Sequence, residues 1–305
     1  MEPTALASLR STFAGRMQEN IPLSGHTSAR IGGPADILLL VRSAGELAEA
    51  ASFLWQANVP FVLLGGGSNV LVSDKGVRGV VVINRARGVR IEAQAYPPAI
   101  EAESGTTLND LARRAARQGL SGLEWAATVP GTLGGAVYGN AGAFDGETAA
   151  SLVSVDLLFR TDGRQTWPVD KLEYNYRTSI LKLSHIPVVI LSARLALQPG
   201  DPLAIQEKMD QFSAVRRKTQ PAGASLGSMF KNPPGDFAGR LIEAAGLKGR
   251  RIGNAEISAA HANFFINHGQ TKAADIHALI GLARQTVAEK FGVNLELEIE
   301  LIGEW

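Results

Sequence analysis

The chain has 305 residues, of which 45% are hydrophobic and 19% are charged, a composition typical of a globular protein. Its 30 Lys and Arg residues nearly balance its 29 Asp and Glu residues, so the formal net charge of +1 argues against nucleic acid binding by the protein as a whole. The absence of cysteine excludes disulfides, thiolate nucleophiles and cysteine-ligated zinc or iron–sulfur sites.

The length suggests about two domains of roughly 150 residues each. No basic segment followed by an apolar stretch opens the sequence. The longest apolar runs, such as 37–41 and 79–83, are only long enough for strands. We therefore expect a cytoplasmic protein.

The first part of the chain predicts three strands, at 37–41, 61–64 and 79–83. A helix is expected at 43–57, because a Ser-x-x-Glu capping box begins at Ser43 and apolar residues follow at helical spacing. Together these segments predict a βαβ unit whose second strand ends at a glycine-rich turn.

The middle part predicts a strand at 98–103 and a helix at 107–118. A hairpin of strands 154–159 and 164–168 and a long apolar strand at 188–197 follow. The hairpin is expected because Thr161-Asp162-Gly163 is a typical turn sequence. The turn residues Pro199-Gly200-Asp201-Pro202 then mark the expected domain boundary.

The last part predicts three helices and two strands, namely helices at 202–218, 239–245 and 271–291 and strands at 263–267 and 293–302. In the final strand, apolar residues alternate with Glu296, Glu298 and Glu300, which predicts one apolar and one acidic face. Such an acidic face is most often solvated, whereas a single glutamate in a cleft would act as an acid or an electrostatic partner. The mixture of elements predicts an α+β fold.

The glycine-rich segment Gly65-Gly66-Gly67-Ser68-Asn69 directly follows a predicted strand. Glycines let successive backbone N–H groups form a concave nest for a phosphate, and Ser68 and Asn69 add side-chain donors. The segment matches neither a Walker A loop nor the G-x-G-x-x-G fingerprint, and a tight surface turn is the alternative interpretation.

A second glycine cluster runs from Pro130 to Gly135 and continues as Asn140-Ala141-Gly142. Small residues at this density allow a flat or extended ligand to lie against the backbone. A long loop is the simpler explanation for this cluster alone. Two such clusters in one chain favour a single extended ligand that carries phosphate.

Two serine motifs in the last third suggest acyl-transfer chemistry but lack its context. Gly223-Ala224-Ser225-Leu226-Gly227 matches the G-x-S-x-G nucleophile elbow, which needs a strand before it and a helix after it. Ser228-Met229-Phe230-Lys231 matches an S-x-x-K motif whose partner motifs, Ser-Asp-Asn and Lys-Thr-Gly, are absent. The histidines lack the i, i+4 spacing of a helical metal site, so no metal is expected.

The segment Tyr174-Asn175-Tyr176-Arg177 places two tyrosines beside an arginine. Arginine can bind a carboxylate through two parallel hydrogen bonds. A stacked pair of surface residues is the alternative interpretation.

Several of these segments occur in the order found in one family. They are 27–35, 64–69, 130–135, 140–142, Tyr176-Arg177, 227–233 and 295–299. Together they resemble the UDP-N-acetylenolpyruvoylglucosamine reductase (MurB) family, flavoenzymes of bacterial cell-wall precursor synthesis, over about 22–303. The glycine turns alone would also fit the wider family of FAD domains that includes vanillyl-alcohol oxidase.

The resemblance implies a two-lobed FAD-binding domain of the vanillyl-alcohol oxidase (PCMH) type plus a C-terminal α+β substrate domain. The expected lobes are 1–88 and 89–200, and the substrate domain is 201–305. FAD is the implied cofactor and NADPH the implied co-substrate. The implied substrate is UDP-N-acetylglucosamine enolpyruvate, which is reduced to UDP-N-acetylmuramate, and no obligate protein partner is expected.

The resemblance also assigns roles to residues. Arg177 would stabilise negative charge on the substrate carboxylate, Glu298 would help to stabilise the enol form, and Ser228 would donate the proton. The implied FAD contacts are Leu64, Gly65, Gly66, Gly67, Ser68, Asn69, Gly105, Pro130, Gly131, Thr132, Gly135, Asn140, Ala141 and Gly142. The implied substrate contacts are Tyr176, Lys231, Asn232 and Asn263.

One form of this family carries an extra tyrosine-bearing loop after the Tyr-Arg motif. Here Arg177 and Ser228 are only 51 positions apart with no tyrosine between them, so the sequence resembles the shorter form. Two rival interpretations stay open: an FAD oxidase of the same fold that acts on another substrate with oxygen, and a non-catalytic flavin- or nucleotide-binding module.

Overall fold

The computed structural model describes residues 3–305, with side chains from Leu6 onward. The chain forms two compact units, each made of three segments. The first unit comprises Met1–Met17, Leu38–Gly66 and Val81–Val215, and the second comprises Gln18–Ile37, Gly67–Val80 and Arg216–Trp305. The expected consecutive lobes at 1–88, 89–200 and 201–305 stay a prediction, separate from this division.

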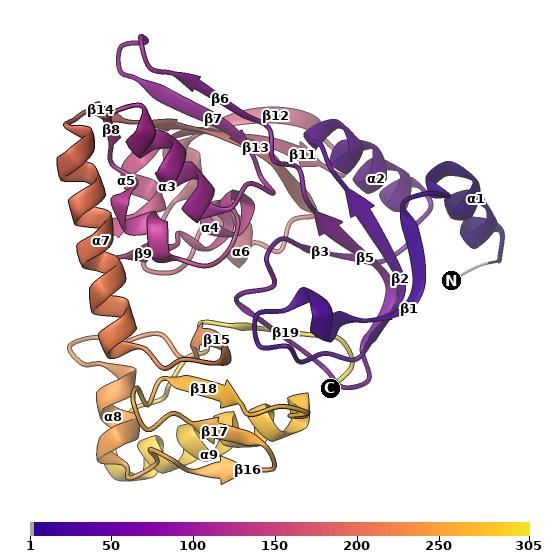
Figure 1. Cartoon of the computed structure of the whole chain (residues 1–305). Helices are drawn as coiled ribbons and strands as arrows, with labels where there is room; N and C mark the ends of the chain where they lie inside the picture. The colour runs from indigo at the N-terminus through magenta and orange to yellow at the C-terminus, as the bar shows by residue number, and fades with distance from the viewer. Residues whose placement is uncertain (1–2) are drawn as a thin grey trace. The chain divides into compact units, whose positions relative to one another are not determined.

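A five-stranded antiparallel sheet in the order β12-β11-β13-β7-β6 lies at the centre of the first unit. Its strands are β6 (Val89–Glu92), β7 (Ala99–Glu103), β11 (Leu152–Phe159), β12 (Gly163–Pro168) and β13 (Val188–Ala196). Helices α3 (Leu108–Arg117) and α4 (Leu133–Gly139) lie beside it (Figure 1). Buried side chains of this sheet and these helices, among them Ile100, Leu111 and Leu157, form one apolar core.

Helix α2 (Ala44–Gln56) begins where the sequence predicts it. The Ser43 hydroxyl accepts a hydrogen bond from the Glu46 N–H at 3.1 Å, as expected for a helix N-cap. The Glu46 carboxylate returns to the Arg42 N–H rather than to that of Ser43, so the capping box is only half formed.

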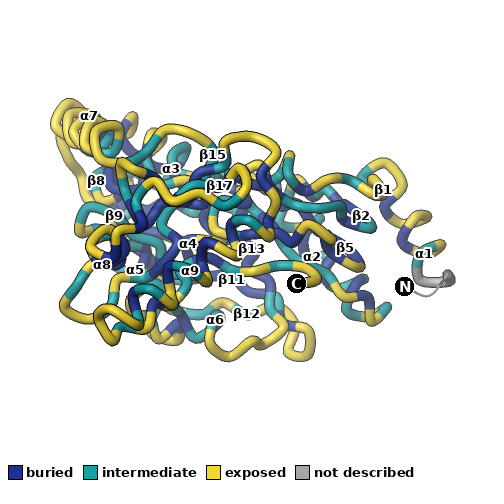
Figure 2. The backbone as a smooth tube through the Cα atoms, turned by 90° about the horizontal axis from the view of Figure 1, so that it is seen from below, coloured by how far each residue is buried: buried dark blue, intermediate teal, exposed yellow. Residues whose placement is uncertain are grey.

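Shorter elements connect the sheet and helices of the first unit. They are α1 (Pro3–Phe13), β3 (Phe61–Leu64), β8 (Leu120–Ser121), η2 (Glu124–Thr128), β9 (Gly142–Ala143), β10 (Gly146–Glu147), α5 (Thr148–Ser151), η3 (Val169–Leu172), α6 (Ile180–Leu183) and β14 (Gln198–Pro199). The long helix α7 (Pro202–Thr219) starts at Asp201, whose carboxylate accepts the Leu203 N–H at 3.0 Å. Figure 2 shows α7 exposed along most of its length.

A further sheet has the order β1-β2-β5-β3. Strands β2 (Pro34–Val41) and β5 (Val77–Asn84) each begin in the second unit and end in the first. Strand β1 (Met17–Pro22) and the 3-10 turn η1 (Leu23–His26) precede them.

The second unit contains a four-stranded antiparallel sheet in the order β15-β18-β17-β16 (Figure 1). Its strands are β15 (Ala224–Ser228), β16 (Arg251–Ile252), β17 (Ala255–Ile257) and β18 (Phe264–Asn267). Helices α8 (Ala238–Ala244) and α9 (Ala273–Phe291) share an apolar core with Leu226 and Phe265 of the sheet. One face of the sheet is therefore covered by these helices.

Two expectations from the sequence are wrong. The final strand at 293–302 is regular only as β19 (Glu300–Ile302), which pairs in parallel with β4 (Val70–Val72). Leu301 is 37% exposed rather than buried. The backbone of 296–298 bonds instead to the irregular segment after β15, so no extended ladder forms there. The glycine cluster, for which a long loop is the simpler explanation, contains the helix α4.

None of the helices in the described part of the chain combines the length and the apolar character that crossing a membrane requires.

A remote side chain caps the N-terminus of α9. The Asp74 carboxylate accepts hydrogen bonds from the Ala273 N–H at 2.8 Å and the Ala274 N–H at 2.9 Å. The first N–H groups of a helix have no acceptor within it, so this carboxylate satisfies donors that would otherwise face solvent.

We expect Asp74→Ala to lower the free energy of unfolding by about 1 kcal/mol, because two α9 donors lose their acceptor. Urea denaturation measures the change. The matched control is Lys75→Ala, since the exposed Lys75 side chain makes no hydrogen bond or ion pair with residues 3–305. A loss of the same size in both variants would contradict the capping role.

Candidate functional site

The two predicted glycine clusters contact each other in the first unit. Leu64 ends β3 as a buried residue, and Gly65 and Gly66 follow it. A Cβ atom on Gly65 would clash with the Thr132 side chain, and one on Gly66 would lie 3.3 Å from the Gly131 Cα. Glycine is therefore favoured at 65 because a methyl group there would displace the Thr132 side chain.

A third segment joins this cluster at Gly105. A Cβ atom on Gly105 would lie 2.6 Å from both the Ala86 nitrogen and the Asn84 Oδ1. The buried Asn84 amide donates to the Ser104 hydroxyl at 2.8 Å and accepts the Ala86 N–H at 2.9 Å, which fixes both segments. Asn84 is not among the site residues predicted from the sequence, although a polar residue at the end of an apolar strand is a usable signal.

Main-chain hydrogen bonds tie the second cluster to the same place. The Leu133 N–H donates to the Thr106 carbonyl and the Gly134 N–H to the Ser104 carbonyl, both at 2.8 Å. Thr132 is the residue before α4, Pro130 and Gly131 lead into it, and Gly135 lies in its first turn. A Cβ atom on Gly135 would have no closer neighbour than Thr132 Oγ1 at 4.0 Å.

This cluster of glycines and small residues fits a flat, phosphate-bearing cofactor such as FAD. Gly65 and Gly105 have no room for a Cβ atom, and the main chain at 133–134 bonds to that at 104–106, so glycines and main-chain groups gather at one place. The buried Thr106 hydroxyl beside it has no hydrogen-bond partner within the described chain. A buried polar atom without a partner is destabilising, as expected where a bound group completes a site.

The rest of the first glycine loop lies in the second unit. Gly67 has φ +60°, and a Cβ atom there would clash with the His26 carbonyl, so this position also requires glycine. Ser68 follows it. The Asn69 side chain donates to the Glu298 carbonyl at 3.0 Å, and the Asn69 carbonyl accepts the Glu300 N–H at 2.9 Å. The loop is thereby attached to the segment that carries Glu298.

A β-bulge sets the direction of Ser228. Ser225 pairs with Ile266 and Ser228 with Phe264, so β15 has one extra residue between them. Gly227, at φ +76°, adopts the left-handed conformation that such a bulge needs. The bulge puts Ser228 on the side opposite Leu226 and the helices; without it, Ser228 would point into the core. The half-buried Ser228 hydroxyl makes no hydrogen bond within the described chain.

Asn263 fixes the backbone that follows Ser228. Its buried side-chain amide accepts the Phe230 N–H at 2.9 Å and donates to the Phe230 carbonyl at 2.8 Å. Its own carbonyl accepts the Met229 N–H at 2.8 Å. One asparagine thus replaces a strand partner for two consecutive residues. These bonds favour a positioning role for Asn263, in addition to the substrate contact that the sequence predicts for it.

Glu298 approaches the same segment from the other side. Its N–H donates to the Met229 carbonyl at 3.0 Å, and the Lys231 N–H donates to the Glu296 carbonyl at 2.9 Å. The Lys231 ammonium lies 3.4 Å from the exposed Glu296 carboxylate, a weak pair at a solvated edge. The Asn232 side chain accepts the Ala238 N–H at 3.1 Å at the start of α8.

The second unit thus brings together Ser228, Glu298, Asn69 and Asn263, which lie far apart in the sequence. Lys231 and Asn232 continue directly from them.

The Tyr-Arg motif lies in the first unit and contacts the second glycine cluster. Tyr176 and Arg177 occupy the centre of a tight turn closed by Asn175 and Thr178, and Arg177 has φ +56°. That conformation is uncommon for a residue with a side chain. The Arg177 guanidinium donates to the Gly142 carbonyl at 2.7 Å and to the Asn140 carbonyl at 3.5 Å.

Neighbouring groups support this turn. Asn140 ends α4 in a left-handed conformation and donates to the Asn175 carbonyl at 3.2 Å, while Ala141 lies between it and Gly142. Burial, with a smaller contribution from Glu147, raises the pKa of Tyr174 above its ordinary value. Tyr174 therefore stays protonated and donates to the Val137 carbonyl at 2.8 Å.

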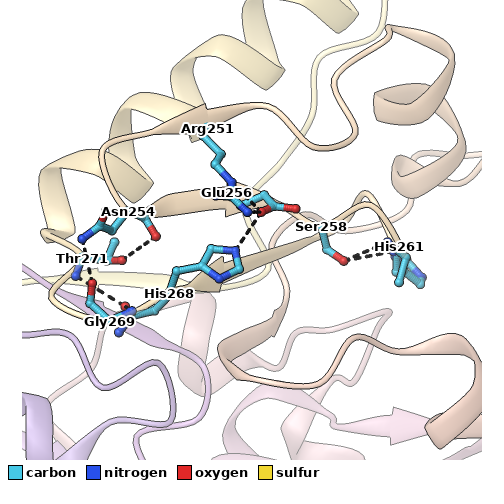
Figure 3. A network of polar contacts seen from close by, with 10 residues as sticks. Arg251, Asn254, Glu256, Ser258, His261, His268, Gly269 and Thr271 are labelled. Atoms are coloured by element: carbon cyan, nitrogen blue, oxygen red, sulfur yellow. Dashed lines mark hydrogen bonds and ion pairs between the residues drawn. The ribbon is translucent and has the colours of Figure 1, made fainter.

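The serine motifs of acyl transfer find no support. Ser225 lies inside β15 rather than at a strand-to-helix turn. No group of three or more potential metal ligands gathers within residues 3–305. Figure 3 shows that His268 pairs with Glu256, which also binds Arg251, so this histidine is held in a polar network of β17 and the segment after β18.

His261 supports Asn263 from within the preceding turn. The Ser258 hydroxyl accepts the His261 N–H at 3.3 Å (Figure 3), and the His261 Nδ1 accepts the Asn263 N–H at 3.2 Å. That second bond requires an unprotonated Nδ1. Burial is the main cause that lowers the pKa of His261 below its ordinary value of 6.5.

We expect Gly65→Ala to lower the free energy of unfolding by about 1–3 kcal/mol, because the added methyl displaces Thr132. Gly139→Ala is the control, since no atom lies within 4 Å of a Cβ there and alanine favours a helix. Urea unfolding of both variants measures the difference. If Gly65→Ala were as stable as Gly139→Ala, the close approach would be disproved.

We expect the stability that His261 contributes to be complete above pH 6.5, its pKa when unfolded, and to be lost as the pH falls toward its lower folded pKa. In that range protons bind the unfolded chain preferentially. As the pH is lowered from 7.5 to 5, the melting temperature should therefore fall more steeply for the wild type than for His261→Phe. Equal slopes would show that this ring does not titrate with unfolding.

Comparison with known proteins gives matches to both parts of the chain. A family model described as "FAD binding domain" matches residues 35–167, and one described as "UDP-N-acetylenolpyruvoylglucosamine reductase, C-terminal domain" matches residues 219–302. These matches confirm the expected α+β architecture of an FAD-binding domain followed by a C-terminal domain.

Curated relatives and a solved structure match nearly the whole chain. The UDP-N-acetylenolpyruvoylglucosamine reductase of Chloroflexus aggregans is 45% identical over 289 residues, covering 94% of this chain and 97% of the relative. That of Moorella thermoacetica is 44% identical over 307 residues, covering 100% and 99%. The crystal structure of MurB from Thermus caldophilus matches with a TM-score of 0.77 and 37% identity, covering 93% of this chain and 99% of that one. The chain therefore belongs to the UDP-N-acetylenolpyruvoylglucosamine reductase family.

Proposed function

We propose that this chain reduces UDP-N-acetylglucosamine enolpyruvate to UDP-N-acetylmuramate, with NADPH as the reductant, in peptidoglycan precursor synthesis. Family membership supports the reaction class. The observation that carries the assignment to residues is the Glu298 N–H bond to the Met229 carbonyl, 3.0 Å long, which holds Glu298 beside the residue that follows Ser228.

The cofactor is proposed to lie on the glycine cluster, where the segments at 65–66, 105 and 130–135 meet. FAD bound there would supply the redox chemistry, namely hydride transfer from NADPH to the terminal carbon of the enolpyruvyl double bond. Gly65 and Gly105 keep side chains out of this region, and the Asn140–Gly142 segment holds the Arg177 guanidinium.

Arg177 is proposed to bind the substrate carboxylate. Addition of hydride to the terminal carbon moves negative charge onto that carboxylate, so a fixed cation there stabilises the transition state more than the ground state. The carbonyls of Gly142 and Asn140 orient the guanidinium in advance, which limits the reorganisation needed during the reaction.

Ser228 is proposed to donate the proton to the carbon next to the one that takes hydride. A serine hydroxyl is a weak acid, but its partner would be a strongly basic, carbanion-like carbon, so position outweighs acidity. The Gly227 bulge and the Asn263 amide fix that position through the backbone.

The remaining residues are proposed to bind the substrate or its enol form. Glu298 would help to stabilise the enol. Lys231, Asn232 and Tyr176 carry donors suited to phosphate or carboxylate oxygens. Asn263 would act mainly by holding Phe230.

We expect Ser228→Ala to leave bleaching of the bound flavin by NADPH near normal and to slow the second half-reaction by roughly 100-fold or more, because the proton donor is lost. Anaerobic stopped-flow absorbance separates the two half-reactions. Ser225→Ala is the matched control on the same strand and should leave both rates unchanged.

Three outcomes would contradict this proposal. Loss of flavin reduction in Ser228→Ala, with intact turnover of pre-reduced enzyme, would remove Ser228 from proton transfer. Rapid reoxidation in air, with no response to the enolpyruvyl substrate, would favour an oxidase. Wild-type protein that binds flavin but transfers no electrons would be a binding module.

A further inference from the structure

Arg85 lies at the glycine cluster but is not among the residues proposed above to contact FAD or the substrate. It follows the end of β5, between Asn84 and Ala86, and is half-buried. Its guanidinium donates to the Gly65 carbonyl at 2.8 Å. The cation is therefore attached to the first residue of the glycine loop.

This cation lacks a counter-charge. Arg85 forms no ion pair with any residue from 3 to 305. The charged group that acts on it is Arg87, which is also positive. Burial first, and then repulsion from Arg87, lowers the pKa of Arg85. Arginine nevertheless stays protonated in proteins, so the positive charge persists in a partly desolvated place.

A desolvated charge without a partner is costly, and proteins usually pair such a charge with an anion. The Gly65 carbonyl satisfies one N–H group and leaves the charge itself unneutralised. Gly65 is half-buried and the adjoining Gly66 is exposed, and successive glycines are typical of the main-chain nests that bind anions. Both features point to an anionic ligand that arrives from outside the chain.

We propose that the Arg85 guanidinium, held at Gly65, binds the diphosphate of the dinucleotide cofactor and neutralises part of the diphosphate's negative charge. The proposal rests on FAD binding as set out in the proposed function. A diphosphate carries the negative charge that this place lacks, and arginine binds phosphate oxygens through parallel N–H groups. The alternative role for Arg85 is a purely structural brace of the Gly65 carbonyl.

Three variants separate the two roles. Arg85→Gln removes the charge but keeps an N–H donor for the Gly65 carbonyl, and Arg85→Lys keeps the charge. Arg87→Gln is the matched control, because it removes an exposed positive charge two residues away. Each is prepared as the full-length protein stripped of flavin, and FAD is titrated by fluorescence at low and high salt.

We expect Arg85→Gln to raise the Kd for FAD by roughly 10- to 100-fold and to flatten its salt dependence, because a charge-assisted contact is lost. Arg85→Lys should lie between this variant and the wild type, and Arg87→Gln should stay within about threefold of the wild type. Flavin-free Arg85→Gln should melt at or above the wild-type temperature, since it no longer buries an unpaired charge.

The opposite results overturn the proposal. Wild-type affinity for FAD in Arg85→Gln, or an equal loss in Arg87→Gln, removes Arg85 from the diphosphate site. Wild-type affinity together with a wild-type melting temperature of flavin-free Arg85→Gln establishes the brace, because glutamine still supplies an N–H group for the Gly65 carbonyl. Failure of the wild type itself to bind FAD would refute the proposed function together with this inference, and is thus distinguishable from failure of the inference alone.

Discussion

The hydrogen bonds between the Asn263 amide and the Phe230 main chain hold the chemically important end of the second unit in place. Phe230 is fully buried and lies beyond the regular ladder of β15, so its N–H and carbonyl need partners that no strand supplies. A single side chain supplies both. With Phe230 fixed, Met229 can bond to Asn263 on one side and Glu298 on the other, and Ser228 acquires a defined direction.

In the first unit, mainly glycines and main-chain hydrogen bonds hold the candidate site in place. Its segments at 65–66, 84–86, 104–106 and 131–134 approach so closely that a Cβ atom on Gly65 or Gly105 would clash with a neighbouring segment. Main-chain groups bond across the cluster, and polar side chains such as Asn84 fix the segments from behind. Fixed main-chain groups next to the carbonyl-bound guanidinium of Arg85 suit a phosphate-bearing molecule, because groups already held in place lose little freedom on binding.

Local patterns predicted much of this fold. Helix α2 starts at Ser43, α7 at Asp201 and the β11–β12 hairpin turns at Gly163 as expected, because caps and turns depend on neighbouring residues. The prediction of a strand over 293–302 is wrong because the carbonyl of Glu296 and the N–H of Glu298 bond to a segment some 65 residues earlier. No local sequence pattern encodes such a contact. The site residues came from motif order, whereas the positioning roles of Asn84 and Asn263 are visible only in their tertiary contacts.

The bulge at Gly227 explains why Ser228 faces away from the helices although it lies only two residues after the core residue Leu226. Ser225 lies within the regular pairing, and the extra residue before Ser228 puts both serines on the face opposite Leu226. A weak acid gains value in catalysis only through placement, since its reaction depends on distance and alignment more than on pKa. Placement here comes from a glycine, an asparagine and a register shift, so the serine alone does not define the motif's chemistry. The surrounding backbone therefore decides what the Ser228 hydroxyl can reach, because the bulge at Gly227 sets its direction.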